Sequence, residues 1–184
     1  MTPTKSHSSS TRLLHWAMAF IILSMLCLGL SMIQSLAVWQ PDALKLHKSF
    51  GIIALILVIV RLLNKSISQS PALPADLPTW QQRAAHLTHF GLYMAMLLMP
   101  LSGWLMQSAD NRSVTLFNWL TLPQLIDPSI TAYAFFREMH AIVTWLFLLL
   151  IFMHIGAALY HGLIRQDGVL SSMLFRKKPD SHGE

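Results

Sequence analysis

Two histidines lie inside one long apolar segment near the end of the chain. His140 and His154 are 14 residues apart within residues 137–161, a stretch long and apolar enough to cross a bilayer as a helix. At 1.5 Å and about 100° per residue, both rings would leave one face of the helix, roughly 21 Å apart. Polar side chains inside a membrane are costly and usually functional. Because imidazole is a common axial ligand of haem iron, this spacing favours two haems, one near each membrane surface.

An intramembrane histidine can also do no more than hydrogen-bond a neighbouring helix. Haem ligation therefore requires opposing ligands from elsewhere in the chain, and three other apolar segments carry candidates. His15 lies near the start of the first apolar segment, and His47 lies near the start of the second. His86 and His89 are three residues apart near the start of the third, so they share one face of a helix.

The composition is typical of a membrane protein. The chain has 184 residues, of which 54% are hydrophobic and only 11% are charged, against about 25% charged in globular proteins. The single cysteine, Cys27, excludes a disulfide framework, a zinc site of paired cysteines and an iron–sulfur cluster. The formal charge of +5 does not indicate nucleic acid as a partner, because the basic residues flank apolar segments. No carboxylate pair, nucleophile with a base, or phosphate-binding loop is evident, so we expect no catalytic residues beyond the cofactor sites.

The hydropathy pattern predicts an all-α fold, an integral membrane four-helix bundle that forms one domain over residues 1–184. The predicted spans are residues 13–36, 44–64, 83–106 and 137–164. Pro100 is expected to kink the third span. The longest connector, residues 107–136, contains T-L-F-N-W-L-T-L-P-Q-L, which is apolar and aromatic enough to lie along the membrane interface.

The distribution of lysine and arginine beside the spans predicts the orientation, because cytoplasmic segments carry an excess of both. Nine basic residues lie on the side of the termini and the second connector, namely Lys5, Arg12, Arg61, Lys65, Arg83, Arg165, Arg176, Lys177 and Lys178. Four lie on the opposite side, namely Lys45, Lys48, Arg112 and Arg137. Both termini are therefore expected to be cytoplasmic. His47 and His140 then fall near the outer surface, and His15 and His154 fall toward the cytoplasm, which makes two bis-imidazole sites.

Two further residues follow a histidine after 14 positions. Gly29 follows His15 in this way, and it would either let a flat macrocycle approach the backbone or simply allow close helix packing. Arg61 follows His47, which puts it on the same helix face at the depth of the inner site. Its planar fork could pair with a haem propionate, or it could anchor the helix among lipid headgroups.

Four motifs in order resemble the bacterial cytochrome b561 family, which consists of small di-haem membrane proteins with four helices. They are L-L-H-W, L-H-K-S-F-G-I, A-A-H-L-T-H, and M-H followed after 13 residues by H-I-G-A-A-L-Y-H. The match covers nearly the whole chain. The resemblance implies two haem b groups in a bacterial inner membrane. It implies that His15 and His154 ligate the inner haem iron and that His47 and His140 ligate the outer haem iron.

Depth along the helices leaves His89 open as an alternative ligand of the inner haem. His15 is three residues from the nearest cytoplasmic arginine, whereas His154 is 11 residues from its own and His89 is six from its own. His89 therefore matches the depth of His154 somewhat better, although helices tilt and extend beyond the bilayer. If His15 is the ligand, His89 is expected to bond a propionate or a quinone, or to belong to a polar cap on the cytoplasmic helix ends.

His161 is the predicted quinone residue. It is seven residues after His154, so an α-helix would place it beside the inner haem and roughly 10 Å nearer the cytoplasm. A neutral imidazole there can donate a hydrogen bond or a proton to a quinone oxygen. His86 shares the propionate or quinone expectation at this end of the bundle. The opposing possibility is a quinone at the outer haem, beneath the third connector and close to Trp119.

Bis-histidine iron has no open position, so the predicted function is one-electron transfer and not oxygen binding. The first hypothesis is transport of single electrons between an unidentified outer, periplasmic donor and the quinone pool, with ubiquinone or another quinone as substrate. By resemblance, the family includes an enzyme that oxidises superoxide and reduces ubiquinone, so a superoxide:ubiquinone oxidoreductase is one specialisation. Lys45 and Lys48 flank His47 and could attract an anionic donor, although four acidic residues balance the basic residues on that side.

The alternative hypothesis is a membrane-anchor subunit that passes electrons for a separate redox enzyme. Its contact surface would be the apolar part of the third connector, residues 115–125. Quinone reduction from superoxide by the purified chain alone would distinguish the two hypotheses, so the sequence leaves open whether the chain is an enzyme by itself.

Overall fold

The computed structural model describes residues 7–34, 36–68 and 76–174. The basic residues Lys5 and Arg176 to Lys178 and the prolines Pro71 and Pro74 lie outside the described residues. Within the described residues, the elements are α1 (Ser9–Ile33), α2 (Gln40–Ile67), α3 (Thr79–Ala109), β1 (Thr115–Leu116), β2 (Leu120–Thr121), α4 (Ile130–Leu159), the π-helical turn η1 (Tyr160–Arg165) and α5 (Val169–Met173). The prediction of an all-α fold is confirmed, since the only strands described here are two residues long.

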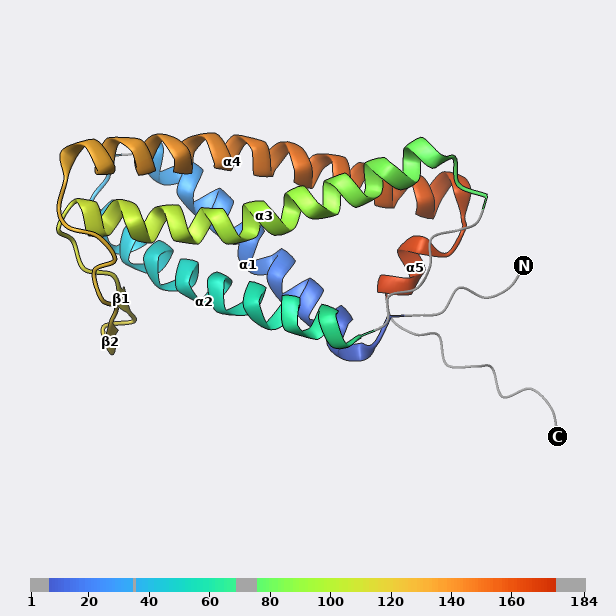
Figure 1. The fold of residues 1–184 in the computed structure, drawn as a ribbon, viewed down its shortest axis with the longest axis horizontal. Helices are drawn as coiled ribbons and strands as arrows, with labels where there is room; N and C mark the ends of the chain where they lie inside the picture. Colours follow the sequence, from blue (N-terminus) through green and yellow to red (C-terminus); the bar gives the residue numbers. More distant parts are fainter. Residues whose placement is uncertain (1–6, 35, 69–75, 175–184) are drawn as a thin grey trace.

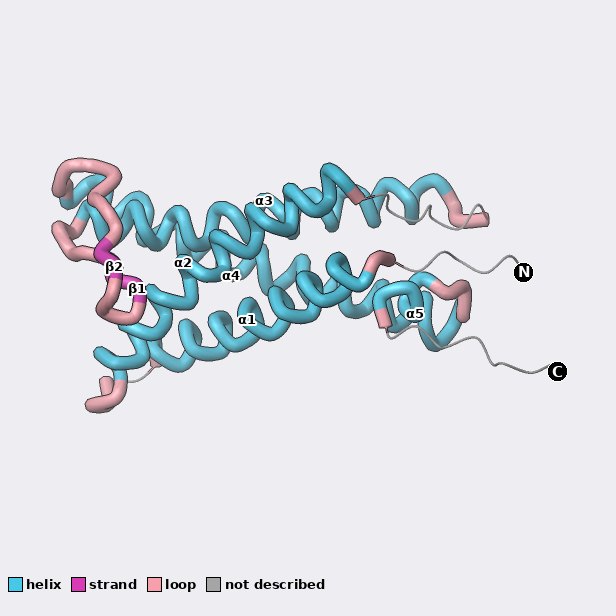
Figure 2. The backbone as a smooth tube through the Cα atoms, turned by 90° about the horizontal axis from the view of Figure 1, so that it is seen from below, coloured by secondary structure: helices cyan, strands magenta, loops and turns pink. Residues whose placement is uncertain are grey.

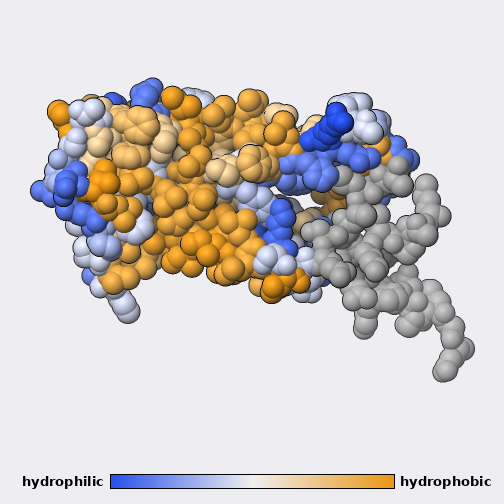
Figure 3. Space-filling model, in the orientation of Figure 1, coloured by the Kyte–Doolittle hydropathy of each residue, from blue (hydrophilic) through white to orange (hydrophobic). Residues whose placement is uncertain are grey.

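The four long helices α1 to α4 carry the apolar surface of a membrane protein. Each is long and apolar enough to cross a membrane, with η1 extending the fourth span to Arg165. Large hydrophobic side chains such as Phe20 and Phe152 point outward and are exposed. Figure 3 shows a broad apolar band across the middle of the molecule, with hydrophilic residues gathered toward its ends. The fold is therefore a four-span bundle whose outer face is suited to lipid.

The helices are arranged as two packed pairs. α1 packs along α2 and α3 packs along α4, and the two pairs meet through α2 and α3. Figures 1 and 2 show the helices running along one long axis, with the hairpin at one end and α5 at the other. Both described ends of the chain lie at the α5 end (Figure 1). α1 and α4 are not among the closely packed helix pairs of the described residues, so side chains can meet in the space between them.

The buried core between the helices is small and consists of two clusters. One buried cluster joins Met18 of α1 to Leu55 and Val58 of α2. A second joins Ala95 of α3 to Val143 and Phe147 of α4. Since lipid tails are as apolar as these side chains, close packing rather than water exclusion holds the helices together.

All four long helices begin earlier than the predicted spans. α1 begins at Ser9 instead of residue 13, and α4 begins at Ile130 instead of residue 137. Ser8 and Ser129 are the caps, because each side chain accepts a hydrogen bond from a backbone N–H in the first turn. The spans were bounded by hydropathy, whereas a capped helix continues past its apolar part. α3 also continues through Pro100, so the proline does not end it.

The chain leaves the fourth span through a π-helical turn. In η1 the hydrogen bonds reach one residue further than in an α-helix, which changes the rotation per residue. Because η1 begins at Tyr160, the chain from His154 to that residue keeps α-helical periodicity and the rotation changes only from His161 onward. Gln166 and Gly168 follow in left-handed conformations, with φ of 53° and 83°, and they reverse the chain into α5.

Side chains of α1 hold the segment that contains α5. Arg12 Nη1 donates to the carbonyl of Leu174 at 2.7 Å, and Trp16 Nε1 donates to the carbonyl of Met173 at 3.0 Å. The first and last described parts of the chain are thus joined at one end of the bundle.

The β1–β2 hairpin was not predicted. Thr115 pairs with Thr121 and Leu116 pairs with Leu120 across an antiparallel ladder. Three residues, 117–119, separate the paired Leu116 and Leu120, and among them Phe117 and Asn118 have φ of 45° and 62°, the left-handed conformation that is common in tight hairpin turns. An asparagine is suited to this conformation, whereas a phenylalanine is unusual there. The apolar connector that the sequence predicted to lie along the membrane interface is therefore a defined hairpin.

Candidate functional site

Two pairs of histidines face each other across the bundle at two depths. At the hairpin end, His47 of α2 and His140 of α4 have ring centroids 6.4 Å apart. At the α5 end, His15 of α1 and His154 of α4 have ring centroids 6.1 Å apart. After the orientation that the sequence predicts, we call these the outer pair and the inner pair. The structure therefore brings together the four histidines that the sequence singled out, in the predicted combinations.

The separation of the rings suits a metal placed between them. Metal–imidazole nitrogen bonds are about 2 Å long. Two such bonds, plus the distance from each coordinating nitrogen to the centre of its ring, come to roughly 6 Å between ring centres. Both pairs match this length. The described residues contain no group of three or more His, Cys, Asp or Glu side chains arranged to hold a metal ion. Two opposed imidazoles without further ligands fit an iron whose four equatorial ligands come from a macrocycle, which is haem iron.

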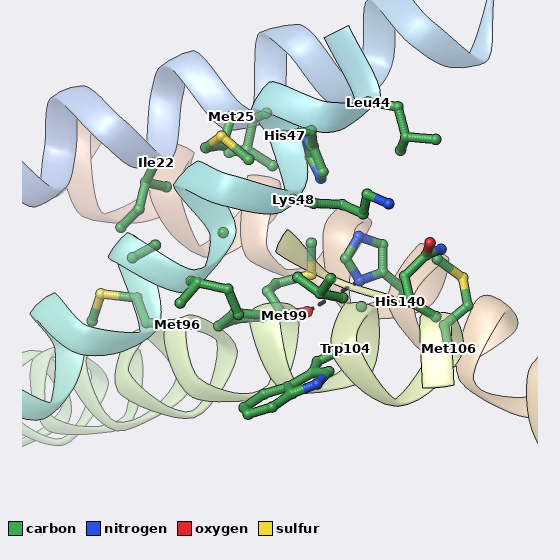
Figure 4. A pocket seen from close by; sticks show the side chains of 18 of the residues that line it. Ile22, Met25, Leu44, His47, Lys48, Met96, Met99, Trp104, Met106 and His140 are labelled. Atoms are coloured by element: carbon green, nitrogen blue, oxygen red, sulfur yellow. Dashed lines mark hydrogen bonds between the residues drawn. The ribbon is translucent and has the colours of Figure 1, made fainter. Parts of the chain in front are cut away.

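A cavity of about 240 Å³ opens beside the outer pair. His47 and His140 lie on its wall (Figure 4), and six methionines contribute to the rest, namely Met18, Met25, Met32, Met96, Met99 and Met106. Gly51 also lines it and has open space where a Cβ would stand. Methionine side chains adapt to irregular apolar shapes, so this wall is suited to a large apolar cofactor.

Two glycines make room for the rings of the outer pair. A Cβ on Gly29 would lie 3.3 Å from Cε1 of His47, and a Cβ on Gly103 would lie 3.4 Å from Cε1 of His140. Gly29 therefore accommodates a histidine ring. The sequence had suggested that it accommodates a macrocycle or a packed helix.

Hydrogen bonds fix the protonation of His140. Ser102 is fully buried and uses its only proton to donate to the carbonyl of Met99 at 2.8 Å. Nδ1 of His140 lies 2.9 Å from Ser102 Oγ and 3.1 Å from Met99 O, and it must be the donor because neither oxygen has a proton left to give. Nε2 of His140 is then unprotonated and available to a metal, with its basicity raised by these bonds.

His47 has a different environment. Its Nδ1 atom is buried and has no hydrogen-bond partner in the described part of the chain. A buried unpaired nitrogen costs about 1–3 kcal/mol, so its persistence on the cavity wall favours a ligand that the imidazole binds. The oxygen Oε1 of Gln107, on the same wall, is also buried and unpaired within the described residues.

The inner pair belongs to a cluster of three histidines. The ring of His89 lies 5.4 Å from that of His154, closer than the 6.1 Å between His15 and His154. A separation of 5.4 Å is short for a metal between two imidazoles, whereas 6.1 Å suits one. The geometry therefore favours His15 as the partner of His154. His89 lies beside the pair, as its depth along the helix had predicted.

Arg61 reaches the inner pair from α2. Its Nη2 atom donates to Nδ1 of His15 at 3.0 Å, and its Nε atom donates to the hydroxyl of Tyr93 at 3.3 Å. The side chain of Lys65 lies over the ring of the same tyrosine, 4.5 Å from its centre. Arg61 thus lies at the predicted depth and points into the bundle, not into the headgroups.

His161 lies at the α5 end, in a network of charged groups. Its Nδ1 atom is 2.6 Å from Oδ2 of Asp167, and its ring contacts that of Tyr160. Arg165 donates to the same Oδ2 atom at 3.0 Å and to Asp76 at 2.7 Å. The network runs from largely buried groups at His161 and Asp167 to an exposed carboxylate at Asp76.

The carboxylate of Asp167 is held in its charged form. Partial burial acts to raise its pKa, but hydrogen bonds from His161 and from the backbone N–H of Val169 outweigh burial, so the pKa lies below its usual value. An ionised carboxylate only accepts hydrogen bonds. Nδ1 of His161 is therefore the donor, which leaves Nε2 free to exchange protons.

His86 and His7 lie outside the two histidine pairs. His86 is exposed and its Nδ1 atom bonds the carbonyl of Gln82 on its own helix, so it is not brought into the cluster. His7, near the start of the described chain, lies against α5 through a backbone hydrogen bond to Ser172. Burial, together with the charges of Arg61 and Arg12, lowers the pKa of His7.

The basic residues at the outer end differ in whether they have an acidic partner. Lys45 pairs with Asp42 at 2.9 Å, and Arg112 pairs with Asp110 at 2.7 Å. Lys48 lines the outer cavity, where its ammonium group contacts only a backbone oxygen among the described residues, that of Ser113 at 3.4 Å. Lys48 thus has no acidic partner there, and it is the lysine closest to the outer pair's cavity.

Sequence reasoning missed Ser102 and Asp167. Ser102 comes 38 residues before the histidine that it contacts, and no spacing rule joins them. Asp167 follows His161 by six residues, but only the π-helical turn and the reversal after it bring the two side chains together.

The chain also resembles known proteins over most of its length. Residues 6–176 match the family model described as prokaryotic cytochrome b561. The chain is 31% identical over 169 residues to cytochrome b561 homolog 2 of Escherichia coli (strain K12), covering 90% of this chain and 89% of that protein. It is 30% identical over 132 residues to cytochrome b561 homolog 1 of the same organism, covering 72% and 74%. The chain therefore belongs to the prokaryotic cytochrome b561 family, the membrane cytochromes of electron transport that the resemblance had predicted.

Proposed function

We propose that this membrane cytochrome carries single electrons between a donor at the outer surface and a quinone in the membrane, and that it uses two haem b groups. The observation that carries the proposal is the pair of opposed imidazole sites at two depths, with ring separations of 6.4 and 6.1 Å. Haem b supplies reversible one-electron chemistry at such sites. Two sites at different depths divide the distance that an electron has to cross.

In this proposal His47 and His140 hold the outer haem iron, and His15 and His154 hold the inner one. The preformed Nδ1–H donor state of His140 supports its ligation through Nε2. At the inner site, Nδ1 of His15 accepts a hydrogen bond from Arg61, so the proton of that imidazole lies on Nε2. Ligation through Nε2 requires Arg61 to release His15. A propionate is the acceptor that its planar fork would then take.

The orientation is also part of the proposal. Figure 1 puts both described ends of the chain at the α5 end of the bundle, and the basic residues of the whole sequence favour that end by nine to four. The positive-inside rule then makes the α5 end cytoplasmic and the hairpin end periplasmic.

The quinone is proposed to react at the α5 end, close to His161. Reduction of a quinone to a quinol takes up two protons with two electrons, so the site needs a proton donor. His161 is held through Nδ1 by Asp167, so its Nε2 atom can take up a proton from the cytoplasmic side and pass it to a quinone oxygen. The exposed Asp76 and the shared Arg165 connect this pair to the cytoplasmic surface. No comparable histidine–carboxylate pair occurs at the outer end within the described residues.

Superoxide is the proposed outer donor. Two superoxide anions, one quinone and two protons would give two molecules of oxygen and one quinol. Lys48 supports an anionic donor, because its ammonium group lines the outer cavity without an acidic partner in the described structure. A small anion can be steered by such a charge. The chain would then act as an oxidoreductase without a separate catalytic subunit.

The ligand assignment predicts which substitutions remove which haem. The wild-type protein should contain two haem b groups per chain by the pyridine haemochrome assay. His47→Ala and His140→Ala should each leave one haem, and His15→Ala and His154→Ala should each leave the other, because each iron loses one axial ligand. Redox titration of the remaining haem identifies which one is retained. A haem lost in His89→Ala but kept in His15→Ala would move the inner ligand from α1 to α3.

Ser102 is predicted to lower the midpoint potential of the outer haem. Its oxygen accepts from Nδ1–H of His140 and so increases the electron donation of that ligand to ferric iron. Ser102→Ala should raise the potential of this haem with the haem content unchanged, measured by spectroelectrochemical titration. Thr144→Val is the matched control, because Thr144 bonds the backbone carbonyl of His140 and not its ring. Equal shifts in the two variants would contradict the assignment.

His161 is predicted to control quinone reduction. His161→Ala should retain both haem spectra and lower the turnover of a soluble quinone analogue by about 100-fold, the usual contribution of a positioned proton donor. Asp167→Asn should give a smaller loss, because the imidazole remains but is held less firmly. His86→Ala is the control at the same end of the bundle. Unchanged turnover in His161→Ala would reject the inner quinone site and favour one beneath the hairpin.

The donor is tested by comparing two lysines of the outer end. Lys48→Gln should lower the rate of haem reduction by superoxide, by up to about tenfold at low ionic strength, and the difference should shrink as salt is added. Lys45→Gln should change the rate less, because Asp42 already neutralises that lysine. Stopped-flow absorbance of the haem bands measures both rates. Equal effects of the two substitutions would argue against steering by Lys48, and no reduction by superoxide would favour the role of a subunit for a separate redox enzyme.

A further inference from the structure

The β1–β2 hairpin projects from the side of the bundle and presents an uncharged tip. In Figure 1 it extends across the direction of the helices, beside the outer end of α2. No charged residue occurs from Ser113 to Ile126. Trp119 is 94% exposed and Leu120 is 56% exposed. A large aromatic side chain and a large aliphatic side chain are thus exposed on the hairpin.

The hairpin is fixed to α2. Ser49 Oγ donates to the carbonyl of Thr115 and accepts from the backbone N–H of Phe117, both at 3.1 Å. The ring of Phe117 packs edge-on against that of Phe50, with centroids 5.4 Å apart. At the base of the hairpin, Val114 is buried and lines the outer cavity. The exposed tip is therefore a rigid extension of the bundle, and its position relative to α2 is defined.

Its attachment point lies below the outer end of α2. Ser49 is nine residues after Gln40, the first residue of α2, which is roughly 13 Å along the helix. The 28 residues of α2 extend roughly 42 Å against a hydrocarbon core of about 30 Å, so each boundary lies roughly 6 Å inside the helix end. The base of the hairpin is thus at or below the level where headgroups meet hydrocarbon.

We propose that the tip of the β1–β2 hairpin is inserted into the interfacial layer of the membrane leaflet opposite the chain termini, with Trp119 and Leu120 in contact with lipid. Tryptophan is enriched at this level of membranes, because its ring is apolar and its N–H is polar. The tip carries no charged side chain, whose transfer toward acyl chains would be costly. Lipid surrounds the bundle at the depth of the attachment, whereas a soluble protein would reach the hairpin only above that level.

The insertion has a consequence for the outer cavity. The hairpin base carries Val114 and Ser113, which contact the cavity and Lys48 respectively. A tip held by lipid would fix this base over the cavity and set the depth of the outer site below the membrane surface. This proposal does not depend on the electron donor or on haem ligation.

The test uses the single cysteine of the chain. Cys27→Ser gives a background without cysteine, into which Leu120→Cys is introduced and labelled with a nitroxide. Phe152→Cys provides the lipid reference, because Phe152 is an exposed apolar side chain within the fourth span. Arg112→Cys provides the aqueous reference at the same end of the bundle. The protein in lipid nanodiscs is measured by electron paramagnetic resonance with oxygen, which concentrates in lipid, and with a water-soluble nickel chelate.

The label at position 120 should have an oxygen-to-nickel accessibility ratio between those of the two references and clearly above that at position 112. A ratio equal to that at position 112 would overturn the proposal and leave the hairpin in water, free to contact a soluble partner. Asn118→Cys, at the turn, is measured in parallel. If Leu120→Cys disturbs the hairpin, the result at position 118 decides by the same criterion.

Discussion

The opposition of two imidazoles across a helix bundle is the constraint on which the rest of this structure depends. α4 supplies one ring at each depth, and α1 and α2 supply the opposing rings. A ring separation near 6 Å requires that these helices stand apart while the bundle stays closed elsewhere. The close pairing of α3 with α4 and of α1 with α2 provides the closure. Gly29 and Gly103 then leave space for the rings themselves.

Polar atoms inside an apolar bundle need partners, and the way each one is satisfied distinguishes the sites. Nδ1 of His140 has two acceptors, Ser102 and Met99. Nδ1 of His47 has none in the described part of the chain. At the inner site, the guanidinium group of Arg61 donates a hydrogen bond to Nδ1 of His15. In the proposed holoprotein, the bonds of Ser102 and Met99 would raise the electron donation of His140, so the outer haem is expected to differ in potential from the inner one.

The fold and the histidine pairs were predictable because both follow from local periodicity. Apolar length predicts spans, and a spacing of 14 residues on a regular helix predicts a shared face, so His140, His154 and Arg61 were placed correctly. The hairpin was not predictable, since it depends on Ser49, which contacts residues 66 and 68 positions away. The partner of His161 was missed because Asp167 lies beyond the π-helical turn, where the chain reverses at Gln166 and Gly168. The hydrogen bond of Ser102 was missed because no sequence spacing encodes contacts between helices.

The two ends of the bundle differ in the chemistry that they can support. The end with the hairpin is uncharged over 14 residues of its longest connector, from Ser113 to Ile126, and its basic residues are partly neutralised by neighbouring carboxylates. The end with α5 carries a connected set of ionisable groups, in which His161 bonds Asp167 and Arg165 bridges Asp167 to Asp76. Single electrons can arrive at an apolar end without protons, whereas the reduction of a quinone to a quinol requires protons as well as electrons. The asymmetry of the ends therefore favours the entry of electrons at the hairpin end and the uptake of protons at the α5 end.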